Sequence, residues 1–165
     1  MVAMVKRATP VTLLVCVCLS ALPAPVAAAG PKRCLRPQDV VTEQIVRHGV
    51  FLREASARCA EITPEVTGLW RDFYATYGSR LHAQTVKRET FFQRTFKADA
   101  KDTNLYFDGR LVTNLRNVPV NRSFCQNLKK LLDANKRRGW ASFVKQAKTL
   151  QDEVALDYKL CEAKR

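Results

Sequence analysis

Apolar residues recur at alternating spacings of four and three along most of this chain. Over residues 37–62 the residues with this spacing are Val41, Ile45, His48, Leu52, Ala55, Cys59 and Ile62. Such spacing places side chains on one face of an α-helix, whereas a half-buried strand would show alternation with a period of two. Related patterns cover 64–97, 122–135 and 140–161. We therefore predict helices over these four ranges, and the pattern leaves open whether 64–97 is one helix or two.

One long stretch, residues 99–120, does not follow the helical spacing. It is rich in Asp, Asn and Thr, and it contains Asp108 and Gly109 between two apolar triplets. An Asp-Gly pair in that setting is typical of the two-residue turn of a β-hairpin. We expect an irregular crossover here, either an ordered loop lying on the helices or a short β-hairpin. The predicted fold is an all-α bundle of about four helices joined by this crossover.

The first 29 residues have the features of a cleaved secretory signal peptide. Lys6 and Arg7 precede an apolar run over 11–22, and a cluster of alanines ends before Gly30. The run is shorter than the roughly 20 residues that a transmembrane helix needs. We therefore expect a single helical domain over 30–165, secreted or periplasmic, with no transmembrane segment in the mature chain.

Four cysteines remain after the expected cleavage: Cys34, Cys59, Cys125 and Cys161. An even number of cysteines in an exported chain predicts disulfides, because oxidising compartments allow them to persist. The spacing contains no CxxC pair and no CxxH pair. We therefore expect two structural disulfides, and no metal or other cofactor.

Helix length limits how these cysteines can pair. A straight helix over 37–62 would place Cys34 and Cys59 about 37 Å apart, whereas a disulfide requires Cα atoms within about 7 Å. Two connectivities remain: Cys34–Cys161 with Cys59–Cys125, or Cys34–Cys125 with Cys59–Cys161. We favour the first because it ties the two chain ends together. A break within the first helix would restore the excluded pairing.

The chain is strongly basic, with 28 Lys and Arg against 15 Asp and Glu and a net charge of +13. Residues 121–148 carry a net charge of +7, and Lys136, Arg137 and Arg138 precede Trp140 within them. Cations attract phosphate or sulfate groups, and an indole ring suits a lipid headgroup interface. The predicted anion-binding patch consists of Lys129, Lys130, Lys136, Arg137, Arg138, Trp140, Lys145 and Lys148. The alternative is that Trp140 belongs to the core and that the cations only keep the protein in solution.

Residues with catalytic chemistry are scarce. The only histidines, the side-chain type suited to acid or base chemistry near neutral pH, are His48 and His82, and His48 lies on the apolar face of its predicted helix. The sequence contains no GxSxG, HExxH, P-loop or GxGxxG motif. We therefore expect no enzymatic activity. Asn121 opens an Asn-Arg-Ser triplet that fits the N-glycosylation motif, and it could instead cap the helix that follows.

These features favour a small exported helical protein that binds an anionic lipid, lipopolysaccharide, glycan or nucleic acid. The alternative is a secreted ligand or inhibitor that binds another protein. A four-cysteine helical bundle of this size is similar in outline to short-chain helical cytokines, which implies a cytokine-like role if the host is an animal. In a bacterium the same alternative would be an envelope inhibitor or a stress-protective protein.

Overall fold

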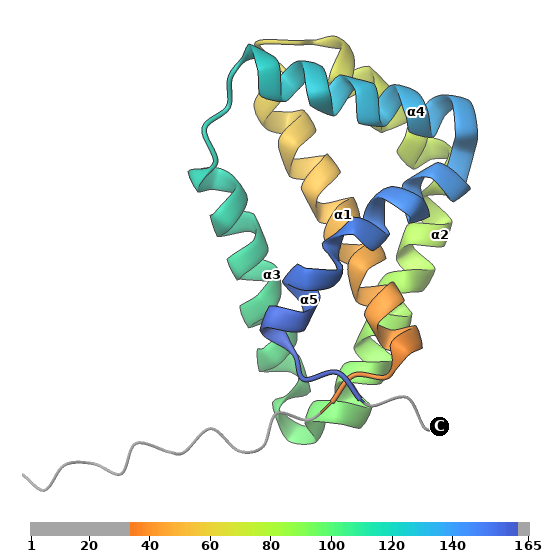
Figure 1. The fold of residues 1–165 in the computed structure, drawn as a ribbon, viewed down its shortest axis with the longest axis vertical. Helices are drawn as coiled ribbons and strands as arrows, with labels where there is room; N and C mark the ends of the chain where they lie inside the picture. Colours follow the sequence, from red (N-terminus) through yellow and green to blue (C-terminus); the bar gives the residue numbers. More distant parts are fainter. Residues whose placement is uncertain (1–33, 162–165) are drawn as a thin grey trace, which may run out of the picture. The chain divides into compact units, whose positions relative to one another are not determined.

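The computed structural model describes residues 34–161, and the predicted signal peptide lies outside them. The elements in chain order are α1 (Pro37–Cys59), α2 (Glu65–Phe96), η1 (Lys97–Asp99), α3 (Ala100–Asn117), α4 (Arg122–Ala147), η2 (Lys148–Leu150) and α5 (Gln151–Asp157) (Figure 1). Within this described part, the β-type pairing is one isolated bridge between Leu35 and Leu160. The predicted all-α class is confirmed. None of the helices in residues 34–161 is both long enough and apolar enough to cross a bilayer.

Helix α1 lies among the other helices and contacts α2, α3, α4 and α5 (Figure 1). Pro37 begins it, and the side chain of Asp39 accepts a hydrogen bond from the backbone N–H of Arg36 (3.2 Å). A proline in the first turn and an acid near the N-terminus both favour a helix start. The first half of α1 is buried on nearly all sides, so its polar residues must find partners inside the protein.

Two hydrophobic clusters hold the helices together. The larger cluster joins Leu52 of α1 to Phe73 of α2 and to Leu128 and Phe143 of α4. The rings of Phe73 and Phe143 stack with centroids 5.0 Å apart. The smaller cluster contains Leu35, Val40, Phe91, Phe92, Ala100, Val154 and Tyr158. Helix α2 contributes to both clusters as one continuous helix, so Gly78 does not divide it.

The prediction for residues 99–120 is wrong, because Ala100–Asn117 form helix α3 and contain neither a loop nor a hairpin. The carboxylate of Asp108 forms an ion pair with the guanidinium of Arg88 in α2. The guanidinium of Arg58 donates hydrogen bonds to the backbone carbonyls of Leu115 and Val118. These tertiary contacts override the turn preference of the Asp-Gly pair, since local propensity is only a weak prior.

Helix α4 bends at Gly139, whose φ of 65° and ψ of −154° are not helical. The bend falls between the two predicted helices over 122–135 and 140–161, although the helix continues up to Arg138. The predicted last helix over 140–161 is too long, since α5 ends at Asp157. The chain beyond α5 is extended because it pairs with Leu35. The N–H of Leu35 donates to the carbonyl of Lys159, and the carbonyl of Leu35 accepts from the N–H of Cys161, both at 2.8 Å.

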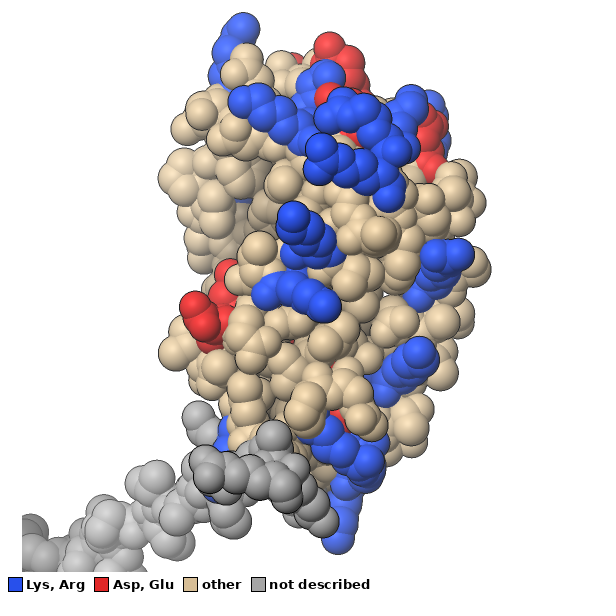
Figure 2. All heavy atoms as spheres, turned by 45° about the vertical axis from the view of Figure 1, so that its right-hand side comes forward, with Lys and Arg blue, Asp and Glu red and all other residues tan. Residues whose placement is uncertain are grey.

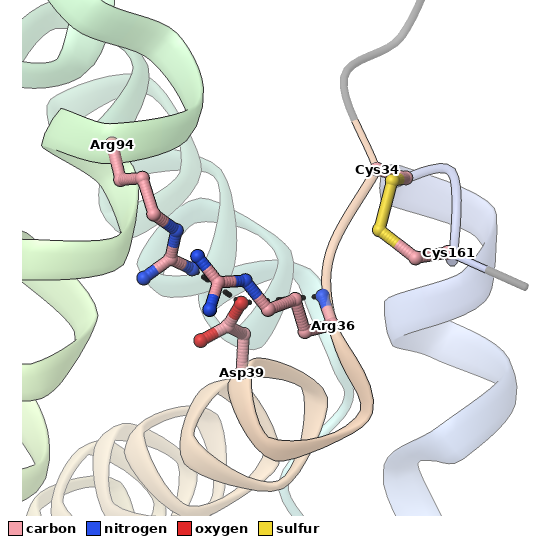
Figure 3. Close-up of a disulfide and its surroundings, with 5 residues drawn as sticks. All are labelled: Cys34, Arg36, Asp39, Arg94 and Cys161. Carbon is pink, nitrogen blue, oxygen red and sulfur yellow. Dashed lines mark hydrogen bonds and ion pairs between the residues drawn. A yellow bond between two sulfur atoms is a disulfide. The ribbon is translucent and has the colours of Figure 1, made fainter. Parts of the chain in front are cut away.

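Two disulfides join these elements, and they follow the first of the two predicted connectivities. Cys34 and Cys161 are bonded with Cα atoms 4.8 Å apart (Figure 3). Cys59, at the end of α1, is bonded to Cys125 in the first turn of α4, with Cα atoms 5.5 Å apart. Beside the first disulfide, Asp39 pairs with Arg94 of α2 at 2.5 Å (Figure 3). The start of α1 is thereby tied both to the last described residues and to α2.

We expect the double substitution Cys59→Ser and Cys125→Ser to lower the free energy of unfolding by about 2–4 kcal/mol, because an open chain gains conformational entropy when it unfolds. Urea unfolding followed by circular dichroism measures the loss. The helical content of the folded variant should stay close to that of the parent, because Cys34–Cys161 remains. A loss below about 1 kcal/mol would show that this bond contributes little to folding.

We also expect Gly139→Ala to destabilise the protein by about 1–3 kcal/mol. Its positive φ is costly for alanine, and an added Cβ would lie 2.6 Å from the hydroxyl oxygen of Tyr77. Gly109→Ala is the matched control, because Gly109 lies in α3 and a Cβ there meets nothing within 4 Å. That control should be neutral or stabilising by up to about 1 kcal/mol. Equal stability of the two variants would contradict the strained bend.

Candidate functional site

The predicted anion-binding residues begin with three cations that directly precede the bend in α4. Lys136, Arg137 and Arg138 are all exposed. The ammonium of Lys136 lies 3.5 Å from the carboxylate of Asp72 in α2. Among the described residues, Arg137 and Arg138 form no ion pair. Figure 2 shows one face of the molecule on which Lys and Arg side chains gather toward one end and others are scattered below.

The remaining predicted cations occupy other positions. Lys129 pairs with Asp133 at 2.9 Å one helical turn away. Lys130 is exposed on the same arm of α4, Lys145 lies on the arm beyond the bend, and Lys148 begins η2. The structure therefore concentrates Lys136, Arg137 and Arg138 at the bend and distributes the other lysines along the helix on both sides of it.

Trp140 is half-buried rather than displayed beside these cations. Its ring stacks on Phe143 with centroids 5.0 Å apart and lies 5.9 Å from the ring of Tyr77. The guanidinium carbon of Arg80 lies 6.0 Å from the Trp140 centroid, within the range of a cation–π contact. Trp140 thus packs against the larger hydrophobic cluster, unlike the three exposed cations before it.

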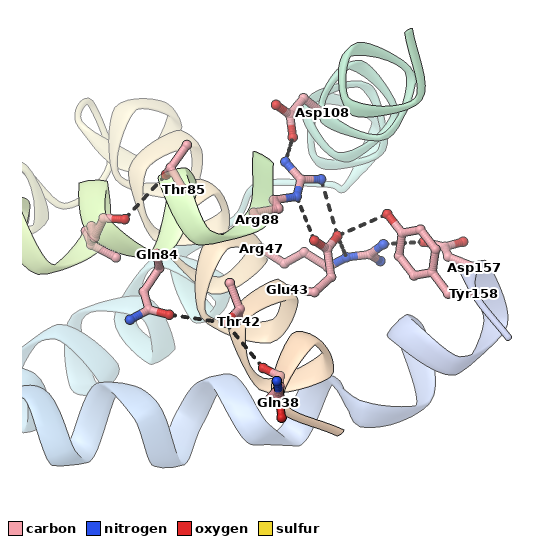
Figure 4. Close-up of polar contacts among 11 residues, drawn as sticks. Gln38, Thr42, Glu43, Arg47, Gln84, Thr85, Arg88, Asp108, Asp157 and Tyr158 are labelled. Carbon is pink, nitrogen blue, oxygen red and sulfur yellow. Dashed lines mark hydrogen bonds and ion pairs between the residues drawn. The ribbon is translucent and has the colours of Figure 1, made fainter. Parts of the chain in front are cut away.

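A buried network of charges surrounds Glu43 of α1, whose side chain has no exposed surface (Figure 4). Arg47 Nε donates to Glu43 Oε1 at 2.8 Å, and Arg88 Nε of α2 donates to Glu43 Oε2 at 2.6 Å. Each guanidinium has a second acidic partner, which is Asp157 at 2.6 Å for Arg47 and Asp108 of α3 for Arg88. One carboxylate and its two arginines therefore link α1, α2, α3 and the end of α5.

This network determines the protonation of its members. Burial alone would lower the pKa of Arg88, but the charges of Glu43 and Asp108 raise it, so the guanidinium stays protonated. Burial and the charge of Glu43 raise the pKa of Tyr158. The phenol of Tyr158 therefore keeps its proton, and its hydroxyl donates a hydrogen bond to Glu43 Oε1 at 3.3 Å.

A second buried polar group lies around His48 of α1. Its Nε2 is 3.0 Å from Oε1 of Gln146 in α4, and the same oxygen accepts from Asn135 Nδ2 at 3.1 Å. Burial lowers the pKa of His48, and the hydrogen bond to Gln146 opposes that shift only in part. His48 is thus neutral near pH 7, and it connects the two arms of α4 to α1.

A cavity of about 730 Å³ lies between α1, α3, α4 and α5. Its size falls within the range of sites that hold small molecules. The apolar side chains that line it include Phe51, Leu111, Leu115, Leu131, Leu150 and Leu156. Polar side chains from both buried groups also reach it, namely Arg47, His48, Gln146 and Asp157. Most of these residues come from α1, α3, α4 and α5, whose arrangement Figure 1 shows, and Leu150 comes from η2.

Asn121 is exposed, directly precedes the first residue of α4 and caps that helix. Its Oδ1 accepts a hydrogen bond from the backbone N–H of Phe124 at 2.9 Å. Capping of this kind contributes about 1 kcal/mol to helix stability. Glycosylation of Asn121 stays a prediction.

Comparison with models of known protein families, with curated proteins and with solved structures finds no match. Across residues 34–161, no group of three or more His, Cys, Asp or Glu side chains is arranged to hold a metal ion.

Neither the network around Glu43 nor the cavity was predicted from the sequence. Glu43 and Arg47 are four residues apart within an apolar stretch, which is a local signal for an ion pair on a buried helix face. Their other partners, Arg88 and Asp157, come from α2 and α5. No local pattern identifies partners so distant along the chain.

We expect Glu43→Gln to lower the free energy of unfolding by about 3–5 kcal/mol, because it leaves Arg47 and Arg88 buried without their shared counter-charge. Glu54→Gln is the matched control, since Glu54 pairs with the exposed Arg53, and it should cost less than about 0.5 kcal/mol. Chemical unfolding of both variants measures the difference. Similar losses would show that the network contributes no more than a surface pair.

Proposed function

We propose that this chain is a non-enzymatic binding protein for an anionic surface or polyanion. The chemistry shared by these partners is a dense array of phosphate or sulfate groups, as in anionic lipid, lipopolysaccharide, sulfated glycan or nucleic acid. The observation that carries the proposal is the exposure of Arg137 and Arg138 at the bend of α4 with no ion pair among the described residues.

The position of these arginines favours contact with a surface. An exposed guanidinium without an acidic partner can bind a phosphate or sulfate without first breaking an ion pair. In the free protein this guanidinium stays hydrated, because it is exposed. The bend itself is held in place, because Trp140 packs on Phe143 and Tyr77 directly beyond Gly139. The net charge is +13 for the full sequence and +11 for residues 30–165, and it adds a long-range attraction that raises the rate of encounter with an anionic partner.

Two further features agree with a non-enzymatic role in an exported protein. His48, which burial keeps neutral near pH 7, is bonded to Gln146, so it serves as a structural contact between α1 and α4. The two disulfides are compatible with a compartment outside the cytosol, where such bonds persist.

A second candidate function, binding of a protein partner, has a specific observation in its favour. Leu105 and Tyr106, adjacent residues of α3, are 60% and 61% exposed. Exposed apolar and aromatic side chains are enriched where proteins meet. We rank this candidate second because Leu105 and Tyr106 are two adjacent residues, whereas the bend presents a run of three exposed cations in a strongly basic chain.

Charge reversal at the bend tests the first proposal. We expect Arg137→Glu with Arg138→Glu to weaken binding to heparin and to phosphatidylglycerol vesicles at least tenfold. The melting temperature should change little, because exposed charges outside the core contribute little to stability. Binding of the parent protein should also weaken steeply between 50 and 200 mM salt, as counterion release requires.

Lys87→Glu with Lys101→Glu is the matched control, because it makes the same change in net charge at exposed residues of α2 and α3. This control should keep most of the affinity if the bend is the contact site. Equal weakening in both double variants would show that net charge alone drives adsorption. Unchanged binding in both would move protein binding to first place.

A further inference from the structure

We propose that the cavity between α1, α3, α4 and α5 is a binding site for one uncharged amphipathic molecule with a single hydrocarbon chain and a hydroxyl head. This proposal is independent of the cations at the bend. It rests on the size of the cavity, on the apolar residues that face it and on the balance of charge at its polar end.

The apolar wall comes largely from α3, a helix that the rest of the protein covers poorly. Ala100 is its one buried residue. Leu111, Leu115 and Val118 follow at spacings of four and three, and all three line the cavity. They span about 10 Å along the helix, at 1.5 Å per residue. A hydrocarbon chain lying along this row would cover apolar surface that the protein leaves uncovered, and such burial is favourable.

The opposite wall is also apolar and comes from α4, η2 and α5. Leu131, Leu150 and Leu156 supply it. Leu156 is 79% exposed, so it lies near the opening of the cavity rather than in its interior. Two facing apolar walls about a volume of 730 Å³ accommodate a small molecule.

Charges at the polar end of the cavity cancel. The lining includes two cations, Arg47 and Arg110, and two acids, Glu153 and Asp157. Both arginines are paired with Asp157. An anionic head would therefore meet no unpaired cation and would lose hydration, which is costly. Glu153 is exposed and forms no ion pair among the described residues, so it is already hydrated and gives a cationic head little to offset the hydration that the head loses.

The exposed amide of Asn114 supplies a hydrogen-bonding group for a neutral head, because it lines the cavity and offers both a donor and an acceptor. Arg47 Nη2 and Asp157 Oδ2 are buried and lie 2.6 Å apart, so they pair with each other and do not contact the head. A hydroxyl head suits the amide because it too both donates and accepts.

Binding can be measured on the full chain with N-phenyl-1-naphthylamine, an uncharged fluorophore that brightens in apolar surroundings. We expect saturable binding of one probe per chain. 1-Decanol should displace the probe at least tenfold more effectively than decanoate or decylammonium, because these carry a charge into the site. Absence of saturable binding would overturn the site, and stronger displacement by either ion would overturn the neutral head.

Matched leucines locate the site. Leu156 and Leu105 are both exposed helix residues, but of the two Leu156 lines the cavity. Leu156→Glu should weaken probe binding about tenfold, whereas Leu105→Glu should leave it within about twofold. Equal effects of the two substitutions would place the probe elsewhere on the protein.

A second matched pair of substitutions tests whether a bulky side chain placed in the cavity blocks the probe. Neither substitution removes a core residue. Asn114 and Thr113 are exposed neighbours on α3, and of the two Asn114 lines the cavity. Asn114→Trp should reduce probe binding at least fivefold, and Thr113→Trp should not. Binding should also be unaffected by 200 mM salt and by charge reversal of Arg137 and Arg138. A loss of probe binding on that charge reversal would place the probe at the bend and overturn the cavity site.

Discussion

The carboxylate of Glu43 lies between the guanidinium groups of Arg47 and Arg88 in the interior of this protein, and the arrangement of the helices depends on that contact. A buried charge that lost one partner would destabilise the fold strongly, so α1 and α2 must keep the distance at which both arginines reach Glu43. Asp108 and Asp157 extend the requirement to α3 and α5. Ion pairs thus help to position α3, together with the hydrogen bonds from Arg58 and the packing of Phe107 against Tyr158.

Two features with different physical chemistry result from this arrangement. The bend at Gly139 ends one helical arm at a run of exposed cations and begins the next with Trp140 packed against Tyr77 and Phe143. The cavity exists because α3 is held at its polar contacts while its apolar row faces α4 and α5 across a space. Salt screens contacts at the bend strongly, whereas apolar burial in the cavity depends little on it. The two proposed activities can therefore be separated by experiment.

Helical periodicity predicted most of the fold, and it failed where tertiary contacts overruled local preference. The four-and-three spacing of apolar residues could be recognised in α1 and α2 because one face of each helix packs in the hydrophobic clusters. Asp108 and Gly109 favour a turn when considered alone, but Arg88 pairs with Asp108 and holds it in a helix. The cavity could not be predicted, because its walls come from four helices whose packing no local pattern records.

Composition, spacing and cysteine number determined the all-α class, the positions of α1 and α2 and the basic run before Trp140, because these properties depend on neighbouring residues. The sequence reduced the disulfides to two alternatives through the length of one helix. The tertiary structure decided which pairing forms, that residues 100–117 are helical and which cations remain unpaired. Each of these outcomes depends on contacts between residues far apart in the chain, and such contacts exist only once the helices have packed together.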